Sequence, residues 1–416
     1  MKTLVLFTSS FPFGSSEAFI ESEFPFLCRA FEKIIIVTNE LEAKDKREVP
    51  ENVTIIRYPY YPSFSYKVRA VFSINTDIFN REAKFIKEKL GLSIHRSVLF
   101  TLLASIAKGY ETRDFIIEEI LKKHSLNIAD TWFYSYWMND IAIGLAMLKE
   151  KFPEAKTLCR AHRGDLYFYT TPDHYLPLRT FLLKHLNKCY VISEDGCNYL
   201  SELLGKEIAS NVVVSRLGTF YYTKQFKSAP KNVPVIVSCS TLTLPKRVTL
   251  IASALSQLSN MKLKWIHFGE GVLRSEIEKE ASALLSKKEN IEYNLPGNYS
   301  NKDLMKFYSE NQIDLFINVS SSEGIPVSIM EAMSFGIPVI ATAAAGGTAE
   351  IVKDGYNGYL LNVNAASAEI ANVITNYLSL TDTQKSELRQ NAFKTWDESY
   401  NAEKNYREFT ESVLAL

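Results

Sequence analysis

Two carboxylates stand eight residues apart, Glu323 and Glu331, in the segment SSSEGIPVSIMEAMSFGIPVIATAAAGGTAE of residues 320–350. A glycine–proline turn follows the first glutamate, and the second falls about one to two turns into the helix predicted after it. Two carboxylates, one before the helix and one inside it, can bind two different polyols, such as a hexose and a ribose. The alternative is a solvated Glu331 with Glu323 as a helix-capping charge. Apolar neighbours on both sides of Glu331 favour the binding site.

The turn between these glutamates predicts an anion site at a helix N-terminus. Pro326 suits the first position of a helix, where its missing N–H is no loss. The backbone N–H groups of Gly324, Ile325 and Val327 would then point out of the positive helix end. Such groups bind a phosphate or sugar hydroxyls.

A basic pair, Lys246 and Arg247, follows a second strand-like run in VIVSCSTLTLPKRVTLIASAL. The pair falls at a loop-to-helix junction, at the carboxyl end of a predicted strand. Cations at this position can neutralise a diphosphate leaving group as charge builds on it. A solvated basic turn is the alternative.

The frame around the two glutamates resembles the retaining nucleotide-sugar glycosyltransferases of family 4, whose motif is glutamate-x7-glutamate. The resemblance implies transfer of a hexosyl group from a UDP- or GDP-sugar with retention at the anomeric carbon, without a metal or other cofactor. It implies that Glu323 binds sugar hydroxyls, that Glu331 binds the ribose, and that Lys246 holds the leaving phosphates. The family usually carries an arginine where this chain has Thr241. Either Arg247 supplies the second charge or donor affinity is lower.

Two further turns in the second half are expected to contact the donor nucleotide. HFGEGVLRSEIE contains Gly269 and Gly271 directly after a strand, where glycine permits close backbone approach. PGNYSNKDLMKFY contains Gly297 and Asn298, whose backbone groups would lie near the base in the family. A GxG pattern alone is weak evidence, so both assignments rest on the resemblance.

The first half offers a glycine–serine loop after its first strand, in SSFPFGSSEAFIESEFPFL of residues 9–27. This loop is similar to one in a polysaccharide-making branch of family 4. Gly14 would let the loop approach the sugar or the diphosphate. Glu17 is expected either to bind an acceptor hydroxyl or to cap the following helix.

A histidine ends another strand, in CRAHRGDLYFY of residues 159–169. The resemblance implies that His162 contacts the transferred sugar, although a lone histidine at a strand end is more often structural. Asp165 would orient the imidazole or bind the acceptor. Tyr136 and Trp137 end a third strand and offer aromatic faces for an acceptor sugar, with core packing as the alternative.

Thirteen apolar, β-branched runs alternate with helical patterns, which predicts parallel sheets covered on both faces. The family resemblance gives this α/β class the GT-B architecture of two Rossmann-like domains. The first domain is expected over 1–218, joined by a final helix of about 394–416. A linker is expected over 219–232 and a donor-binding domain over 233–393. The predicted strands are 3–9, 33–40, 53–59, 130–137, 156–162, 188–194, 211–218, 233–242, 264–271, 291–297, 314–320, 338–342 and 358–363.

The composition fits a cytoplasmic enzyme. The 416 residues balance 47 lysines and arginines against 47 acids, so there is no overall field to attract nucleic acid. The five cysteines show no metal-binding spacing and are expected to be reduced. We expect no signal peptide and no membrane-spanning helix.

One stretch has a marked basic excess. Residues 66–108 carry eight lysines and arginines, including Lys108, against three acids. Phe72, Phe79, Phe85, Leu90, Leu99 and Phe100 are interleaved with them. The stretch is expected either to rest on the inner face of a membrane, next to a lipid-linked acceptor, or to cover the first sheet with solvated lysines.

The sequence therefore predicts a glycosyltransferase of surface polysaccharide biosynthesis, acting on a glycan or a lipid-linked glycan. The competing hypotheses are a nucleotide-sugar epimerase or phosphorylase on the same fold, and a sugar-binding protein without turnover. Donor base, sugar, acceptor, linkage and oligomeric state are left open.

Overall fold

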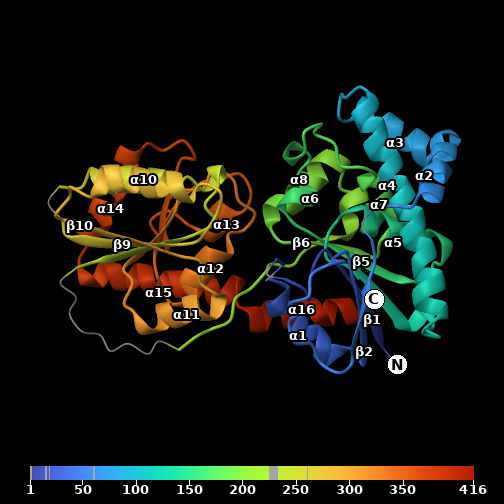
Figure 1. Cartoon of the computed structure of the whole chain (residues 1–416), viewed down its shortest axis with the longest axis horizontal. Coiled ribbons are helices and arrows are strands. Elements are labelled where there is room, and N and C mark those ends of the chain that lie inside the picture. The colour runs from blue at the N-terminus through green and yellow to red at the C-terminus, as the bar shows by residue number, and fades with distance from the viewer. Residues whose placement is uncertain (1, 15, 18, 60, 224–232, 260) are drawn as a thin grey trace. The chain divides into compact units, whose positions relative to one another are not determined.

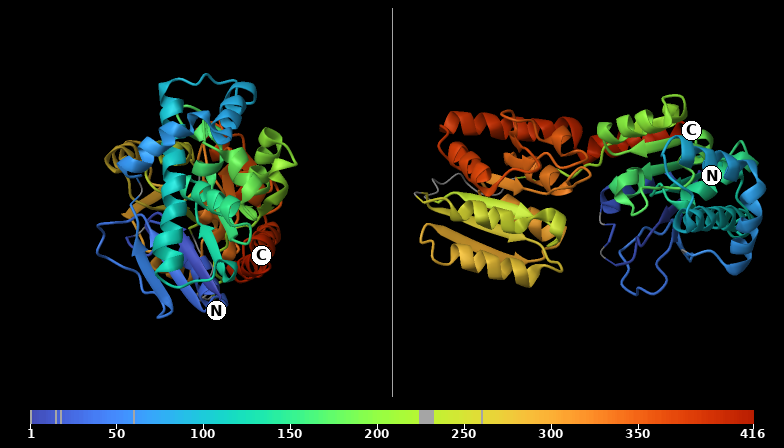
Figure 2. Two further views of the ribbon diagram at one scale, coloured as in Figure 1. Left: turned by 90° about the vertical axis from the view of Figure 1, so that its right-hand side faces the viewer. Right: turned by 90° about the horizontal axis from the view of Figure 1, so that it is seen from above.

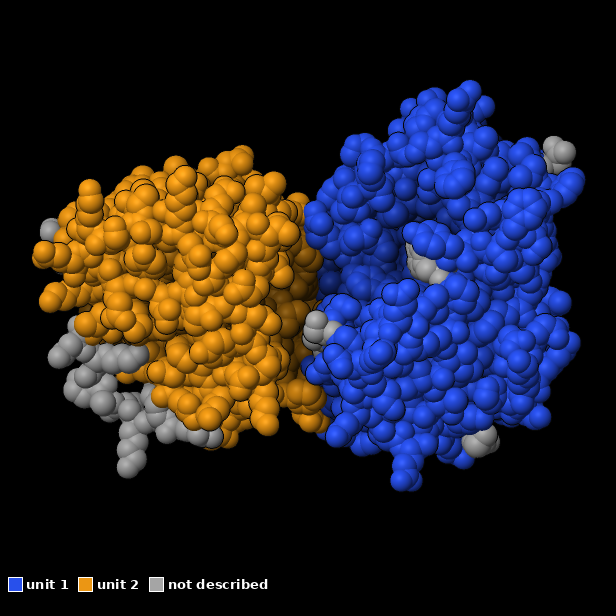
Figure 3. All heavy atoms as spheres, in the orientation of Figure 1, with its two compact units in different colours: residues 1–215, 406–416 blue, residues 216–405 orange. Residues whose placement is uncertain are grey.

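The computed structural model divides the chain into two compact units (Figure 3). Unit 1 comprises residues 1–215 and 406–416, and unit 2 comprises residues 216–405. The structure describes residues 2–14, 16–17, 19–59, 61–223, 233–259 and 261–416. Residues 224–232 of the expected linker lie outside this part. The C-terminal segment that joins unit 1 begins at residue 406, later than the expected position of about 394, because α15 (Asp382–Ser399) belongs to unit 2.

Unit 1 is built on a seven-stranded parallel sheet in the order β3-β2-β1-β4-β5-β6-β7. The chain starts at the centre of this sheet and moves to one edge before it crosses to the other half. The strands are β1 (Thr3–Thr8), β2 (Lys33–Thr38), β3 (Val53–Arg57), β4 (Thr131–Ser135), β5 (Lys156–Ala161), β6 (Lys188–Val191) and β7 (Val212–Val214).

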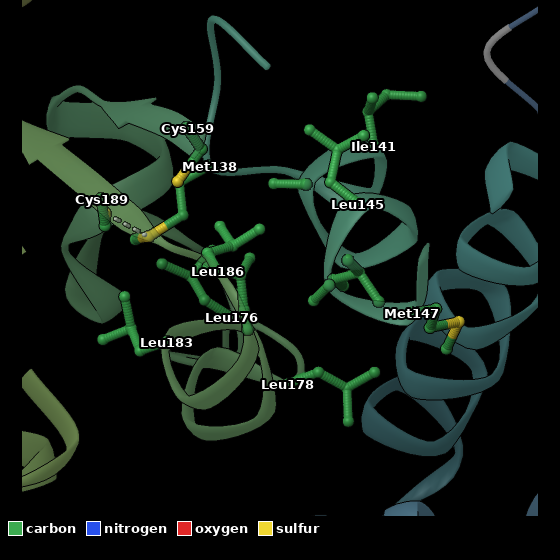
Figure 4. Close-up of a cluster of buried hydrophobic side chains, with 14 of the residues drawn as sticks. Met138, Ile141, Leu145, Met147, Cys159, Leu176, Leu178, Leu183, Leu186 and Cys189 are labelled. Carbon is green, nitrogen blue, oxygen red and sulfur yellow. Dashed lines mark hydrogen bonds between the residues drawn. The ribbon is translucent and has the colours of Figure 1, made fainter. Parts of the chain in front are cut away.

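Helices cover both faces of this sheet, because neighbouring side chains of each strand point to opposite faces. Val5 and Phe7 of β1 join the core beneath α4, α5 and α7, part of which Figure 4 shows. Leu4 and Leu6 join a second core with α1 and the end of α16. The helices are α1 (Ile20–Ala30), α2 (Phe64–Val71), η1 (Phe72–Asn75), α3 (Asp77–Glu88), α4 (Arg96–Phe115), η2 (Ile116–Lys122), η3 (Ile128–Asp130), α5 (Asp140–Lys151), α6 (Arg163–Leu166), η4 (Phe168–Thr170), α7 (Arg179–His185), α8 (Glu194–Leu204), η5 (Ile208–Asn211) and α16 (Ala402–Leu414).

Unit 2 repeats this plan with a six-stranded parallel sheet in the order β10-β9-β8-β11-β12-β13. Its strands are β8 (Val235–Cys239), β9 (Leu263–Phe268), β10 (Ile291–Gly297), β11 (Leu315–Asn318), β12 (Val339–Thr342) and β13 (Gly358–Leu361). Helices lie on both faces of the sheet (Figures 1 and 2). They are η6 (Leu244–Lys246), α9 (Val248–Ser256), α10 (Arg274–Leu285), α11 (Asn301–Glu310), α12 (Val327–Ser334), α13 (Thr348–Ile351), α14 (Ser367–Leu378) and α15. The prediction of two doubly wound parallel sheets is confirmed.

The basic stretch 66–108 forms most of α2, then η1, α3 and the first part of α4. Phe79 is buried, and Phe85, Leu90 and Leu99 pack against the core of unit 1. Lys108 is also buried, and its ammonium donates to the carbonyl oxygen of Pro59. Burial lowers the Lys108 pKa to about 8. These residues therefore cover the sheet, and the expectation of a surface role is wrong for them.

Candidate active site

An ion pair joins the carboxyl ends of two neighbouring strands in unit 2. Lys246 Nζ lies 2.6 Å from Glu323 Oε1. Lys246 follows β8 and Glu323 follows β11, and these strands pair in parallel, so both residues emerge at the same edge of the sheet. Asn318, the last residue of β11, has its side-chain nitrogen 3.4 Å from the same oxygen. Glu323 is only 8 % exposed, so its charge depends on these donors.

The Glu323 loop is held by the loop after β12. The Glu323 N–H donates to Ala345 O at 3.1 Å, and the Gly347 N–H donates to Gly324 O at 2.8 Å. Gly346 has a φ of +106°, and a Cβ placed there would lie 2.0 Å from Glu323 O. Only glycine fits at this position, so the backbone beneath Glu323 is fixed by a close approach between two loops.

Helix α12 begins directly after this loop. Pro326 is the N-cap residue, with φ −72° and ψ 111°, so the helix begins at Val327, one position later than predicted. Within the described residues, the N–H groups of Gly324, Ile325 and Val327 donate no hydrogen bond. The positive end of α12 therefore offers unused donors next to Glu323.

Glu331 lies inside α12 and is 7 % exposed, so the alternative of a solvated helix residue is wrong. Its Oε1 accepts a hydrogen bond of 2.5 Å from Asn301 Nδ2, at the start of α11. Burial raises the Glu331 pKa to about 7, and the Asn301 bond opposes this only in part. The sequence pattern did not identify Asn301. It pointed to the exposed Asn298, three residues earlier on the same turn.

Arg247 does not fit the role of a second phosphate ligand. Its backbone is left-handed, with φ +48°, and its guanidinium points toward the loops that follow β11 and β13. It donates to Val319 O and Val363 O at 2.7 Å each. The expected role is corrected on this geometry: Arg247 ties strand ends together, and Lys246 places its charge beside Glu323.

Gly269 and Gly271 serve close packing between loops. A Cβ at Gly269 would lie 1.9 Å from Ser240 O, and one at Gly271 would lie 2.5 Å from Leu242 O. The Gly269 N–H donates to Gly297 O at 2.9 Å. These contacts join the loops after β8, β9 and β10. A nucleotide-binding role for Gly269, Gly271, Gly297 and Asn298 stays a prediction.

In unit 1, His162 lies at the end of β5 in an aromatic surrounding. Its ring centroid lies 4.6 Å from that of Trp137, 5.1 Å from Tyr136 and 5.5 Å from Phe19. Neither ring nitrogen has a hydrogen-bond partner within the described residues. Burial, with a contribution from the charge of Arg160, lowers the His162 pKa to about 3. The imidazole is therefore neutral at physiological pH, and its two ring nitrogens, one a donor and one an acceptor, are buried without a partner.

Asp165 does not orient this imidazole. Its Oδ1 accepts the His162 backbone N–H at 2.6 Å, and its Oδ2 accepts the Met138 N–H at 2.6 Å. Asp165 thus holds the backbone after β4 and β5 in place. Burial raises the Asp165 pKa to about 6.

Glu17 binds the backbone of its own loop. Its carboxylate accepts N–H groups of Ser9, Ser10 and Phe11 at 3.0, 2.6 and 2.7 Å. The Trp137 indole N–H donates to Glu17 Oε1 at 2.5 Å. Neither expected role holds, because this saturated carboxylate neither caps α1 nor has capacity for an acceptor. Gly14 lies in the same loop at φ +60° with open space around it, and its contact with a ligand stays a prediction.

Tyr136 is fully buried, so its ring has no face free for an acceptor sugar. It packs on Phe19 and lies near a buried ion pair that the sequence reasoning missed.

Arg160 and Glu23, both inaccessible to solvent, approach to 2.9 Å, and Tyr134 bonds to both side chains. No local pattern identifies this pair, because its members lie in α1 and β5.

Two doubly wound parallel sheets, one in each unit, form the GT-B fold, and in unit 2 a carboxylate–lysine pair and a helix N-terminus lie at strand ends. Solved structures agree on the fold. The chain matches sucrose-phosphate synthase of Thermosynechococcus elongatus with a TM-score of 0.70 and 16 % identity, over 99 % of this chain and 98 % of that one. It matches Anabaena HepE in complex with UDP with a TM-score of 0.65 and 18 % identity, over 100 % of both chains.

Residues 222–395 match the family described as "Glycosyl transferases group 1", so the chain contains a glycosyltransferase domain of this family. WcaL of Salmonella typhimurium, assigned to colanic acid biosynthesis as a glycosyltransferase, is 24 % identical over 284 residues, 66 % of this chain and 68 % of WcaL. WcaL of Escherichia coli K12 is 22 % identical over 333 residues, 78 % and 80 % of the two chains.

Neither a membrane span nor a metal cluster is found in the described part of the chain. None of its helices combines the length and apolarity needed to cross a bilayer. No group of three or more histidine, cysteine or acidic side chains there is arranged to hold a metal ion.

Proposed function

We propose that this protein transfers a hexosyl group from a nucleoside diphosphate sugar to a hydroxyl of a glycan, with retention at the anomeric carbon. The observation that carries the proposal is the Lys246–Glu323 pair beside the unused N–H groups of α12. The glutamate-x7-glutamate spacing supports retention, because the resembling family retains configuration. Donors in UDP or GDP form are both compatible with these residues.

The proposed chemistry centres on the charge of the leaving group. As the bond from the anomeric carbon to the diphosphate oxygen breaks, Lys246 and the N-terminus of α12 stabilise the negative charge on the phosphates. Glu323 accepts hydrogen bonds from sugar hydroxyls, and the hexosyl group develops oxocarbenium character. The acceptor oxygen bonds to the same face, and its proton passes to the departing phosphate. These cationic groups form the basis for proposing that no metal is needed.

Glu331 is proposed to bind the ribose of the donor. A buried carboxylate with one amide partner has lone pairs left for two vicinal hydroxyls. Of the proteins similar in fold, HepE is described in complex with UDP and with UDP-glucose. This supports a nucleotide-sugar donor for the present chain.

His162 is proposed to contact the transferred sugar, since both ring nitrogens are unpartnered within the described residues and the ring is neutral. The relatives favour an acceptor in surface polysaccharide biosynthesis. WcaL is assigned to colanic acid biosynthesis, and a further neighbour in fold is the lipopolysaccharide outer core galactosyltransferase WaaB. A glycan or lipid-linked glycan at the cytoplasmic face of a membrane fits these relatives.

The proposal is tested with Lys246→Ala and Glu323→Gln. Each variant should transfer sugar at least about 100-fold more slowly than the wild type while keeping its melting temperature within a few degrees. Glu310→Gln, at an exposed position of α11, is the matched control. Thermal-shift measurements with UDP and GDP identify the donor base. Unchanged turnover in both site variants would reject the site, and donor binding without turnover on any glycan would favour a binding protein.

A further inference from the structure

Helix α2 presents its apolar side to solvent. Phe64, Val68, Val71 and Phe72 are all exposed, with Phe64 at 80 % and Phe72 at 77 %. Their spacing of four, seven and eight residues places them on one side of a helix with 3.6 residues per turn. We call this group the α2 stripe. The opposite side, with Ala70 buried and Tyr66 half-buried, packs against unit 1.

This orientation is the reverse of the usual one. A surface helix of a soluble protein turns its apolar side inward, and large apolar side chains gathered on the outside mark a binding surface. Tyr61, just before the helix, is 78 % exposed and adds a third aromatic ring. Figure 1 shows α2 at the periphery of unit 1.

The charges around the stripe indicate what covers it. Lys67 and Arg69 lie on either side of the α2 stripe on the helix. Among the described residues between 61 and 96, seven exposed lysines and arginines stand against two exposed acids. Asp77 and Glu88 pair with Arg81 and Lys84 of α3, and Arg69 pairs with Asp114 of α4. Within the described residues, four of the seven basic side chains therefore have no acidic partner: Lys67, Lys87, Lys89 and Arg96. The surface near α2 therefore attracts anions.

We propose that the α2 stripe inserts into the interface of an anionic bilayer, with the surrounding lysines and arginines on the lipid headgroups. Aromatic and branched apolar side chains flanked by basic residues suit this boundary, where the apolar side is buried and the charged groups stay hydrated. The surface differs from the expected one, because it is centred on Phe64 and Phe72, and the aromatic residues of α3 face the core. A role of the α2 stripe in catalysis rests on the proposed lipid-linked acceptor, whereas the membrane contact itself does not depend on that acceptor.

Flotation of the full chain with vesicles tests this inference. The wild type should float with vesicles of equal parts phosphatidylcholine and phosphatidylglycerol, and less with phosphatidylcholine alone. The Phe64→Ser/Phe72→Ser double variant should bind about tenfold or more weakly, because two exposed rings no longer enter the bilayer. Lys67→Glu/Lys87→Glu should lose the preference for anionic vesicles. Leu41→Ser, which removes an exposed leucine elsewhere in unit 1, should bind as the wild type does.

Because the changed side chains are exposed, the variants should keep their melting temperatures and their thermal response to UDP or GDP. The inference is overturned if the wild type does not float, or if the Phe64→Ser/Phe72→Ser variant floats equally well. It is also overturned if light scattering shows a wild-type dimer that the same variant converts to monomer, since a second copy would then cover the stripe. A missing nucleotide response with intact flotation would reject the proposed function and leave the membrane contact standing.

Discussion

Replacing Glu331 by glutamine should stabilise the protein at alkaline pH and impair donor binding. The native protein holds the Glu331 proton more tightly than the unfolded chain does, because its pKa is about 7 against an ordinary value of 4.5. Stability is therefore lost as the pH rises from about 4.5 to about 7, and the loss is complete above that range. At about 1.4 kcal/mol for each pKa unit, the cost of the charged form is about 3 kcal/mol.

Glutamine keeps the shape and accepts the same Asn301 hydrogen bond without bearing a charge. Glu331→Gln should consequently gain up to about 3 kcal/mol at pH 8.5, which corresponds to a melting temperature about 5–10 °C higher for a unit of this size. The gain should shrink steadily below pH 7 and vanish near pH 4.5. Differential scanning fluorimetry across this range measures it, with Glu310→Gln as an exposed control.

Donor binding should show the opposite dependence. Ribose hydroxyls donate to the carboxylate and favour its charged form, so the wild-type Kd should fall as the pH rises through about 7. Glu331→Gln should bind the donor more weakly and lose this pH dependence. A stability gain of equal size at pH 5 and pH 8.5 would refute the reasoning, since it would show that the buried charge is not its source.

Three further predictions concern the loops and the buried groups. Gly346→Ala should cost several kcal/mol and abolish the nucleotide-induced thermal shift, because its Cβ meets Glu323 O at 2.0 Å; Gly355→Ala, also at positive φ but with nothing within 4 Å, should cost only about 1 kcal/mol, and equal losses would contradict the clash. Glu23→Gln should destabilise the protein by about 3–5 kcal/mol in urea unfolding, because it leaves the Arg160 charge buried without its partner; a change below about 1 kcal/mol would rule out the pair as a stabilising contact. Since the His162 pKa is about 3, transfer rates between pH 5 and 8 should show no ionisation of this imidazole, and His162→Phe should slow transfer while the protein stays folded; wild-type activity in His162→Phe would remove this residue from the site.

The order of strands and helices could be predicted because the strands are rich in β-branched and other apolar residues, and the central strands of both sheets are buried on both faces. All seven strands of unit 1 lie within predicted runs, and so do the strands of unit 2, except that β9 begins one residue early, at Leu263. The same logic brought Lys246 and Glu323 to one edge, since parallel strands end at the same side of a sheet. Glu331 was recognised as buried because apolar residues surround it in the sequence.

Other roles could not be predicted because they depend on side-chain direction. Arg247 follows Lys246 directly, yet its left-handed backbone turns the guanidinium toward carbonyl oxygens more than 70 residues away in sequence. Glu17 also has a positive φ, which directs its carboxylate to the preceding loop. A single backbone torsion decides such cases, and residue type does not fix it.

The amino-acid sequence by itself determined the fold class, the strand-end positions of the candidate site residues and the presence of acidic and basic groups among them. Periodicity and chain direction suffice for these. Only the tertiary structure decided which charges meet, which ring nitrogens stay unpartnered and which side of α2 faces solvent. These depend on packing between segments far apart in sequence, where distance and burial set the energy of each polar group.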